Sequence, residues 1–337
     1  MKVIIPAAIM QPHYALTGVP KRRFLLPVAG KPIISHLIDN LSGIDIDAIV
    51  LIVNEGPPLK PDYFGMGELY KKMVIIPQPA PGGIAHAVEI GLEAQDKEVL
   101  IVFGDTIFSD PLEKMTRSNM SVIAVKMVSD PENWGIVEVD ENNIVTKAYE
   151  KLPKTRSSLA MTGAYFFKKA QKLRTAILKQ PGFRQHNPHA FTDAIQDMVE
   201  EGEKFLAYPV ENSHDIQHHL NLIETNRYLL TLHQDGLQVR VDWRRRYPDT
   251  VVINPVFIGS RVNIQKSIIG PNVSIAEDTV IKNSIISDSI IGDEVRIENA
   301  ILKHSVIGSG SVYRGLPEKL DFHAGSKFET CINDNIS

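Results

Sequence analysis

The sequence predicts an α/β domain with a mostly parallel sheet, followed by a short β-helix of hexapeptide repeats. Two patterns in its 337 residues carry this prediction. Up to about residue 235, short apolar runs alternate with segments of helical periodicity, which is typical of a parallel sheet with helices on both faces. After a polar stretch at 235–249, single aliphatic residues recur every five or six positions among Gly, Asn, Asp and Ser. That period is typical of a β-helix in which each short strand buries one aliphatic side chain.

The elements expected in the first part follow from these runs. A strand at 3–5 comes first, and a helix begins at Lys31-Pro32, because proline suits an early helical position. Glu141-Asn142-Asn143 separates two strands and predicts a hairpin. The later strands are expected at 48–53, 73–76, 99–103, 122–127, 135–139, 144–148 and 159–167. The later helices are expected at 85–92, 169–178, 192–200 and 218–232.

The aliphatic positions of the second part stay in phase from residue 258 to residue 307. They are Ile258, Ile264, Ile269, Ile275, Ile281, Ile286, Ile291, Ile297, Leu302 and Ile307. A coil takes roughly three such repeats, so the run predicts about three coils. Each coil must stack on a neighbour to bury its apolar face. We therefore expect the ends to be covered by the tail or by another subunit, and the protein to form a homo-oligomer through the β-helix.

Composition excludes several classes of partner. The net charge of −4 gives no bulk attraction to nucleic acid or to an anionic membrane. Cys331 is the single cysteine, which rules out an internal disulfide and fits a reducing compartment. No apolar run reaches transmembrane length, and the N-terminus has no signal-peptide pattern, so we expect a cytoplasmic protein.

Several motifs occur in a fixed order along the chain. They are Leu26-Pro27-Val28-Ala29-Gly30-Lys31-Pro32, Gln78-Pro79-Ala80-Pro81-Gly82-Gly83-Ile84-Ala85-His86-Ala87, Val102-Phe103-Gly104-Asp105-Thr106, Trp134-Gly135-Ile136-Val137-Glu138-Val139 with Glu150-Lys151, Thr162-Gly163-Ala164-Tyr165-Phe166-Phe167, and Leu222-Ile223-Glu224-Thr225-Asn226-Arg227. Together they resemble the sugar-1-phosphate nucleotidyltransferases, particularly the glucose-1-phosphate thymidylyl- and uridylyltransferases that carry a C-terminal left-handed β-helix. The resemblance implies a Rossmann-like nucleotidyltransferase domain at 1–235, a linker at 236–250, a left-handed β-helix at 251–313 and a tail at 314–337.

The implied reaction is attack of a hexose-1-phosphate oxygen on the α-phosphorus of a nucleoside triphosphate, which yields an NDP-sugar and pyrophosphate. The resemblance implies Mg²⁺ held by Asp105 and Asp215. Magnesium takes one or two protein carboxylates besides phosphate oxygens and water. Asp105 follows a central strand at the edge where open α/β sheets bind ligands. For each aspartate the alternative is an N-cap of the segment that follows.

The resemblance places the nucleotide at Ala8, Gln78 and Gly83. Gln78 can present a bidentate amide edge to a pyrimidine, and Gly83 allows close approach of the backbone.

The sugar phosphate is placed by the resemblance at Gly135, Glu150, Lys151 and Thr162. Glu150 is expected to accept hydrogen bonds from sugar hydroxyls, and Lys151 to offer a cation to the phosphate. The alternative for these two residues is a solvated strand end. Leu152 stands where the family has a proline, and this difference is expected to shift the loop slightly.

The loop after the first strand departs from the family. Aligned without gaps, the family's Gly-x-Gly-Thr-Arg segment meets Ile9, Gln11, Pro12 and His13, and Arg23 stands at its lysine. Glycines there let backbone N–H groups approach phosphates, whereas proline has no N–H to donate. Two hypotheses remain open. One is a divergent enzyme in which Arg23 and His13 take adapted catalytic roles at the phosphates. The other is a catalytically silent relative that acts as a sugar-nucleotide sensor or as a scaffold subunit.

Other groups of residues have competing interpretations. His214, Asp215, His218 and His219 have a spacing that suits zinc if the histidines share a helical face, and a polar surface otherwise. His304 is the single histidine of the repeat region. Acyltransferases built on such repeats use a histidine as a base, so an acyltransferase with His304 as its base is a further alternative.

Overall fold

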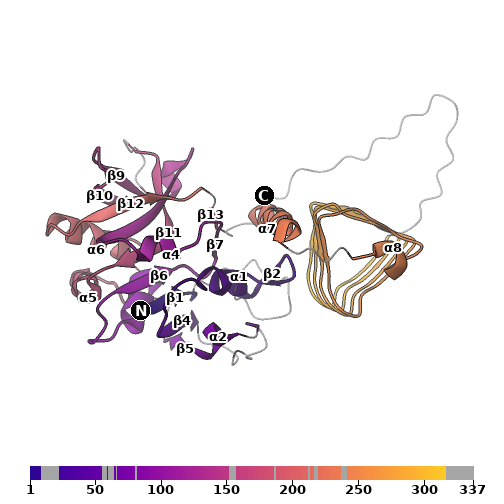
Figure 1. Ribbon diagram of the computed structural model, residues 1–337, viewed down its shortest axis with the longest axis horizontal. Coiled ribbons are helices and arrows are strands. Elements are labelled where there is room, and N and C mark those ends of the chain that lie inside the picture. Colours follow the sequence, from indigo (N-terminus) through magenta and orange to yellow (C-terminus); the bar gives the residue numbers. More distant parts are fainter. Residues whose placement is uncertain are drawn as a thin grey trace.

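The computed structural model describes residues 1–8, 23–54, 59, 64–65, 67–79, 82–151, 157–185, 187–211, 213–215, 219–236 and 241–315. For residues 23, 213–215, 219–220 and 233–236 it describes the backbone alone. Figure 1 shows an α/β domain on one side, a triangular β-helix seen end-on at the other, and helix α7 (His219–Gly236) between them. Of the helices in the described part of the chain, none is both long and apolar enough to cross a membrane.

The centre of the domain is a parallel sheet with antiparallel strands added at one side. Its strand order is β10-β9-β11-β6-β1-β4-β5, and β8 joins β11 to β12. The parallel strands are β1 (Lys2–Pro6), β4 (Ala48–Asn54), β5 (Met73–Gln78) and β6 (Val99–Val102). The others are β8 (Ser121–Met127), β9 (Gly135–Val139), β10 (Val145–Glu150), β11 (Leu159–Phe167) and β12 (Phe205–Pro209). The parallel strands are rich in Val, Ile and Leu because both of their faces are covered.

Helices cover both faces of this sheet, as predicted. One apolar core joins the sheet to α1 (Ile33–Asn40) and α4 (Glu113–Thr116). A second core joins the other face to α3 (Gly83–Gly91), α5 (Ala170–Lys179) and α6 (Ala190–Glu200). Helix α2 (Glu68–Lys71) lies before the edge strand β5. The first predicted helix begins two residues later than expected, because β2 (Pro27–Val28) and β3 (Lys31–Pro32) form a hairpin just before it, after the 3₁₀ turn η1 (Arg23–Leu25).

The β-helix is regular throughout residues 251–315, all of which the structure describes. It has three sheets of four strands each, in the orders β14-β17-β20-β23, β15-β18-β21-β24 and β16-β19-β22-β25. The strands are β14 (Val251–Val252), β15 (Val256–Ile258), β16 (Asn263–Gln265), β17 (Ile268–Ile269), β18 (Val273–Ile275), β19 (Val280–Lys282), β20 (Ile285–Ser287), β21 (Ile290–Ile291), β22 (Arg296–Glu298), β23 (Ile301–Lys303), β24 (Val306–Ile307) and β25 (Val312–Arg314). All strand pairs in these sheets are parallel, as stacked coils of one left-handed β-helix require.

The aliphatic residues that the period singled out line the inside of the β-helix. From Ile258 to Ile297 they are buried in one core, and Leu302 and Ile307 pack against it partly buried. The predicted number of coils was too small, since the strands make four. The count of in-phase Ile and Leu residues missed part of the first and last coils, because Val252 and Tyr313 occupy inward positions there.

Part of the predicted linker is structured. Helix α8 (Trp243–Arg246) begins at Asp242, whose side chain accepts a hydrogen bond from the backbone N–H of Arg245, and it packs on β14. Trp243 and the buried Tyr247 belong to the core of the β-helix, so this segment covers its first coil. The three arginines of α8 are exposed.

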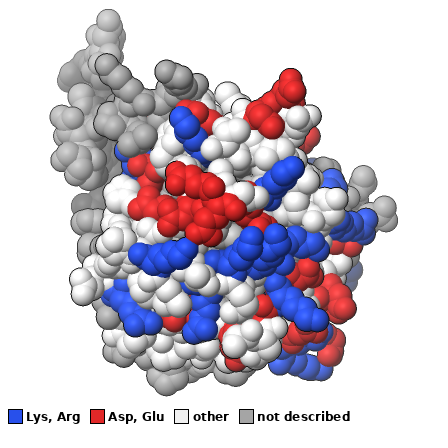
Figure 2. Space-filling view, turned by 90° about the vertical axis from the view of Figure 1, so that its left-hand side faces the viewer, with Lys and Arg blue, Asp and Glu red and all other residues white. Residues whose placement is uncertain are grey.

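Charged side chains of both signs are mixed on the end of the α/β domain that faces away from the β-helix. Figure 2 shows acidic groups there bordered by lysines and arginines. Ion pairs tie the start of α5 to the segment after α6: Lys169, the residue before α5, and Lys172 both contact the carboxylate of Glu203, at 2.8 and 3.3 Å. Such a mixed surface offers no concentrated attraction to a polyanion.

Candidate active site

A cavity of about 270 Å³ opens where the ends of β6, β9, β10 and β11 meet α6. Asp105, Gly135, Glu150, Lys151 and Thr162 all line it. These are residues that the sequence assigned to the metal and to the sugar phosphate, and they come from segments far apart in the chain. The structure therefore brings the predicted sugar-phosphate residues and one predicted metal ligand into one space.

Glu150 is the best-defined polar group in this cavity. It ends β10 and lies opposite Gly135 in the β9–β10 hairpin. The Thr192 hydroxyl, on α6, donates to Glu150 Oε2 at 2.8 Å and fixes the carboxylate. Burial raises the pKa of Glu150, while the Thr192 hydrogen bond and the nearby Lys151 charge oppose that rise. A Cβ at Gly135 would lie 2.8 Å from Glu150 Oε2, so a residue without a side chain is needed for the carboxylate to sit there.

Lys151 follows directly and turns the chain out of the hairpin. Its φ is 48°, in the left-handed region, and its N–H donates to the carbonyl of Trp134 at 3.0 Å. The side chain of Lys151 is exposed at the cavity, where a phosphate can reach its ammonium group. Trp134 also lines this cavity, and the ammonium of Lys126 lies 4.8 Å from the centre of its ring. An aromatic face and a cation beside a fixed carboxylate suit a sugar that carries a phosphate.

Asp105 follows β6 at the carboxyl edge of the sheet and is 8% exposed. The residues after it form a strand, β7 (Thr106–Phe108), so the alternative of a helix N-cap does not apply. Strand β7 pairs antiparallel with β13 (Ser213–Asp215), and Asp215 lies opposite Thr106. Asp215 was expected just before the last helix of the domain, and it lies in β13. Its backbone faces Thr106, the residue that follows Asp105. The backbones of the two aspartates predicted to bind a metal are thus neighbours in the fold.

Thr162 serves the sheet as well as the cavity. It is buried, and its hydroxyl donates to the carbonyl of Ala124 at 3.0 Å. Because the hydroxyl proton is donated to Ala124, Thr162 can act toward a ligand only as a hydrogen-bond acceptor. Its role at the sugar phosphate stays a prediction.

On the nucleotide side, the amide of Gln78 faces inward. Its Nε2 lies 3.2 Å from the carbonyl oxygen of Gly83 and 3.2 Å from His86 Nδ1, both at the first turn of α3. Gln78 is buried, and these bonds hold the start of α3 against the end of β5. Only the Oε1 edge of the amide is left for a base, so a bidentate contact needs the amide to turn. Gly83 has φ 77° and opens α3, as close approach of a ligand to this backbone requires.

Ala8 and the loop beyond it begin beside Asp105. The N–H of Gly104 donates to the carbonyl of Pro6 at 3.1 Å, and a Cβ at Gly104 would lie 2.8 Å from the Cβ of Ala7. The chain therefore leaves β1 at the side of the cavity where Asp105 lies. His13 and the rest of residues 9–22 lie outside the described part of the structure, and of Arg23 only the backbone is described.

The comparisons with known proteins agree with this geometry. A model of the family described as nucleotidyl transferase matches residues 16–231, more than half of the chain. The chain belongs to the nucleotidyl transferase family. The match covers η1, all elements from β2 to β13 and most of α7, including the residues that line the cavity.

Two proteins with known names illustrate what this chain is similar to. It is 30% identical over 230 residues to the bifunctional protein GlmU of Methanocaldococcus jannaschii, across 68% of this chain and 53% of that protein. The chain thus spans about half the length of that relative. It is 25% identical over 287 residues to a glucose-1-phosphate thymidylyltransferase of Streptomyces griseus, across 79% of this chain and 80% of that protein. Among solved structures, a UDP-glucose pyrophosphorylase of Acinetobacter baumannii superposes with a TM-score of 0.58 at 18% identity, over 69% of this chain and 94% of that one. The last similarity shows the fold alone.

Zinc binding by the histidines of the chain has little support from the described residues. Among residues whose side chains the structure describes, no group of three or more His, Cys, Asp and Glu is placed to hold a metal ion. The alternative zinc site needed His214 and His218 on one helical face. His214 lies in β13 and α7 begins only at His219, so the two do not share a helix; His218 itself lies outside the described residues. His304 lies at a β-helix corner, 3.8 Å from Asp288, far along the chain from the cavity residues.

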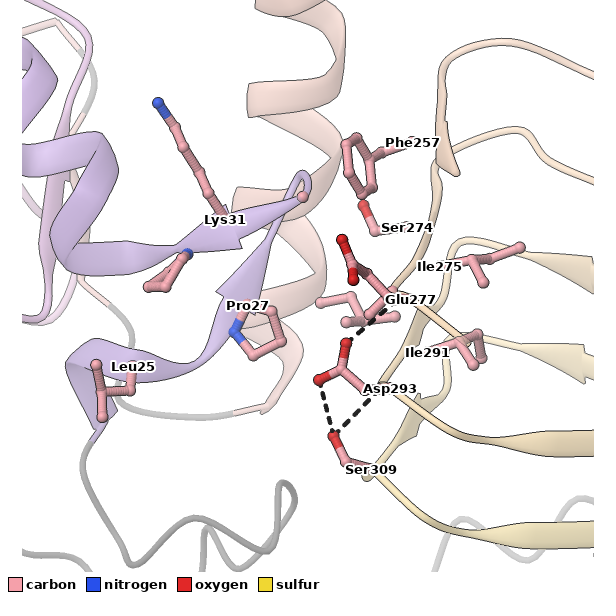
Figure 3. Close-up of a pocket in the computed structure, with 14 residues that line it drawn as sticks. Leu25, Pro27, Lys31, Phe257, Ser274, Ile275, Glu277, Ile291, Asp293 and Ser309 are labelled. Atoms are coloured by element: carbon pink, nitrogen blue, oxygen red, sulfur yellow. Dashed lines mark hydrogen bonds between the residues drawn. The ribbon is translucent and has the colours of Figure 1, made fainter. Parts of the chain in front are cut away.

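A second cavity, of about 320 Å³, lies between the hairpin β2–β3 and the β-helix (Figure 3). Its charged groups are already engaged. Lys31 points away from the β-helix and pairs with Asp39. Glu277 pairs with Arg261 at 2.7 Å, and Asp293 accepts from the backbone N–H of Glu277 at 3.2 Å. The first cavity is therefore the better candidate for a functional site in this chain.

Sequence reasoning missed the residues that shape the cavity without carrying charge. Thr192, Phe191 and Pro188 come from α6 and the turn before it, outside every motif singled out. The signal that could have found Thr192 is its position in the first turn of a predicted helix that must cover the hairpin carrying Glu150. That inference needs the tertiary contact between α6 and β10, which no local pattern encodes.

Proposed function

We propose that this protein is a sugar-1-phosphate nucleotidyltransferase, which joins a nucleoside triphosphate to a hexose-1-phosphate and releases pyrophosphate. The observation that carries the proposal is the single cavity shared by Asp105, Glu150 and Lys151. The names of the relatives support glucose-1-phosphate as the first sugar phosphate to test.

In this proposal the protein acts mainly by positioning the reactants, as phosphoryl transfer requires. Glu150, held by Thr192, accepts hydrogen bonds from sugar hydroxyls and sets the orientation of the ring. Lys151 draws the sugar phosphate toward the same end of the cavity, and Trp134 covers the ring. The attacking phosphate oxygen then faces the side of the cavity where Asp105 lies.

Asp105 and Asp215 suit a magnesium ion, because hard divalent cations prefer oxygen ligands and magnesium needs few from the protein. When bound, the ion neutralises charge on the reacting phosphates. On the nucleotide side, Gly83 and the start of α3 are candidates to face the base, and Ala8 begins the loop that approaches the phosphates. Arg23 and His13 are the candidates to neutralise the triphosphate.

The test is pyrophosphate release from each common nucleoside triphosphate paired with glucose-1-phosphate and with other hexose-1-phosphates. We expect at least one pair to react when magnesium is present, and no reaction above background when the metal is chelated. If every pair in the panel stays at the chelated background, the proposed enzymatic function is wrong.

A second function, binding of a sugar nucleotide without turnover, is favoured by the loop sequence. Pro12 cannot donate an N–H, and Ile9 and Gln11 add side chains where the family has glycines. Losing one preorganised donor can cost on the order of 100- to 1000-fold in rate. Calorimetry separates the two functions: a sugar nucleotide that binds without any turnover supports the silent relative, and no binding by any sugar nucleotide removes the sensor.

Binding of a sugar nucleotide is expected to depend on pH through Glu150. Its pKa is raised, so on acidification its carboxylate is protonated at a higher pH than an ordinary glutamate, and affinity is lost there. Thr192→Val removes a hydrogen bond that favours the ionised form, so the loss of affinity should move to still higher pH. Calorimetric titrations of an NDP-sugar across the acidic range measure this, because its diphosphate does not titrate there.

The matched control is Thr146→Val, which removes a hydroxyl from the same hairpin where it donates to the carbonyl of Glu138 in solvent. Its pH profile should coincide with that of the unmodified protein. Identical profiles for Thr192→Val and the unmodified protein would show that Thr192 does not control the ionisation of Glu150.

A further inference from the structure

His86 is a buried histidine in the first turn of α3, with an exposed fraction of 8%. Its Nδ1 lies 3.2 Å from Nε2 of Gln78, the last residue of β5. The ring of Phe183 meets the imidazole edge-on, with the two ring centres 6.4 Å apart. The imidazole is therefore held between the end of β5 and the segment that follows α5.

The carbonyl of Gly83 determines which end of the Gln78 amide faces His86. A carbonyl oxygen can only accept a hydrogen bond, and that of Gly83 lies 3.2 Å from Nε2 of Gln78. One N–H of the amide therefore points at Gly83, and the other N–H faces His86 Nδ1. Because the amide nitrogen can only donate, Nδ1 must accept. The imidazole is then neutral, with its proton on Nε2.

The surroundings of His86 favour this neutral ring. Burial lowers the pKa of His86, and the positive charge of Arg184 acts in the same direction. The carboxylate of Glu89, on α3, opposes them. That carboxylate also pairs with Arg184 at 3.5 Å and with Arg174 of α5 at 3.8 Å, which balances its charge. Gln78, which faces the ring from β5, carries no charge. Nδ1 of His86 thus stays available as an acceptor.

Gly82 leaves the space that the imidazole needs. A Cβ at this position would lie 2.1 Å from Nδ1 of His86. The φ of Gly82 is −85°, which any residue can adopt, so backbone conformation does not require the glycine. A side chain here would push Nδ1 away from Gln78. The absence of a side chain at Gly82 therefore preserves the hydrogen bond between His86 and Gln78.

With both amide hydrogens engaged, Gln78 can offer a ligand only its oxygen. Gln78 is 4% exposed, and among the residues that the structure describes Oε1 has no hydrogen-bond partner. Gln78 ends β5 at the carboxyl edge of the parallel sheet, the edge at which Asp105 follows β6. An acceptor that has lost most of its water and has no partner favours a ligand that donates to it.

We propose that His86 is a positioning residue for base recognition, which holds the Gln78 amide so that Oε1 alone faces the nucleotide. This role rests on the proposed function, because it requires the base to lie at Gln78. An acceptor there suits a base that carries a hydrogen on the ring nitrogen of its pairing edge, as uracil, thymine and guanine do. Cytosine and adenine have a lone pair on that nitrogen, which Oε1 repels.

His86 is what makes this selection strict. An amide released from Nδ1 regains one free N–H, and it can turn to present that N–H to the lone pair of cytosine or adenine. A fixed acceptor rejects such a base, because the hydrogen bond it was placed to receive is missing. The contact between His86 and Gln78 therefore acts on the choice of base and not on the phosphates.

The test is calorimetric binding of two matched pairs of nucleotides, UTP with CTP and GTP with ATP, to the full-length chain with magnesium. The members of a pair share the triphosphate and the ribose, so the ratio of their dissociation constants reports the base. In at least one pair the unmodified chain should bind the base with the ring N–H at least about tenfold more tightly.

Two variants of nearly the same shape separate the acceptor from the packing. His86→Leu has no acceptor and should reduce this ratio to about threefold or less. His86→Asn can place its side-chain oxygen where Nδ1 stands and should keep the tenfold ratio. His36→Leu is the control, since His36 is equally buried but donates to the carbonyl of Val28, at 2.9 Å, on the other face of the sheet. It should leave the ratio unchanged.

A second measurement needs no nucleotide. Long-range ¹H–¹⁵N NMR of the unmodified chain, with the His86 signal assigned by its loss in His86→Asn, should show a proton on Nε2 and none on Nδ1. A proton on Nδ1 overturns the proposal. So does a ratio in His86→Leu equal to that of the unmodified chain, or a ratio in His86→Asn that falls with it. If no nucleotide binds the unmodified chain at all, the proposed function fails and the role of His86 fails with it, whereas tight binding with unaltered ratios removes the role of His86 alone.

Discussion

Asp105→Asn is expected to lower kcat for nucleotidyl transfer by roughly 100- to 1000-fold. Asparagine keeps the shape of the side chain but removes the negative charge that a magnesium ion needs at the end of β6. Asp215, whose backbone lies opposite Thr106, cannot replace it, because one carboxylate would be left to hold the ion. The KM for the sugar phosphate should change little, since Glu150 and Lys151 are the residues proposed to bind that substrate. Initial rates at saturating and limiting substrate separate the two effects.

Asp45→Asn is the control, since it removes the same charge at an exposed position outside the cavity. A second readout does not need turnover. A ligand that binds the folded state raises its unfolding temperature, so magnesium with a nucleotide should stabilise the unmodified chain and Asp45→Asn, but not Asp105→Asn. Equal rates and equal stabilisation in all three would place the metal elsewhere.

The sequence predicted the cavity residues better than it predicted the contacts they make. Glu150 and Lys151 stand at a strand end next to a hairpin turn, and hairpin signals are local, so their position could be anticipated. The neighbourhood of Asp105 and Asp215 could not be derived from local pattern, because it depends on two three-residue strands, β7 and β13, that are too short to show a period. The family resemblance assigned Asp105 and Asp215 to one metal ion. The pairing of β7 with β13 shows that the backbones of these two residues are adjacent.

For Gln78 the sequence indicated a role from the residue type, but not the direction of the side chain. Its residue type suits base recognition, but side-chain direction depends on what packs beside it, and here His86 and the Gly83 carbonyl take its amide nitrogen. The period of the β-helix, in contrast, encodes burial directly, because one inward aliphatic per short strand is all that each turn of the coil requires. The period underestimated the number of coils only because of the two ends. There Val252 and Tyr313 have fewer neighbours, so these inward positions need not be isoleucine.

The role of the Leu222–Arg227 motif also emerged only from the tertiary structure. Asn226 lies fully buried on α7, between the two halves of the molecule. Its Oδ1 accepts from the backbone N–H of Ala29 at 2.9 Å and from the Ser274 hydroxyl at 2.6 Å. Next to it, Arg227 donates to Asp288 at 2.7 Å. One face of α7 therefore joins the hairpin that follows the loop of residues 9–22 to the β-helix.

Asn226→Leu is accordingly expected to destabilise the chain by about 3 kcal/mol. Leucine fills a similar volume but cannot accept a hydrogen bond, so it leaves the Ala29 N–H and the Ser274 hydroxyl buried without their partner, at about 1–3 kcal/mol for each group. The urea unfolding transition of the region that contains this junction should move to a lower concentration. Because Ala29 stands at the turn of the hairpin β2–β3, the KM for the nucleoside triphosphate should also rise, while sugar-phosphate binding is kept.

Asn263→Ala provides the comparison, since Asn263 is an exposed asparagine on β16 of the β-helix and its loss should change stability by no more than about 0.5 kcal/mol. The difference in unfolding free energy between the two variants separates the effect of the buried hydrogen bonds at the junction from the effect of losing an amide group. If Asn226→Leu unfolds at the same urea concentration as Asn263→Ala, the hydrogen bonds of Asn226 do not hold the two units together. In that case the apolar contacts among Leu222, Leu229 and Ile290 must be sufficient on their own.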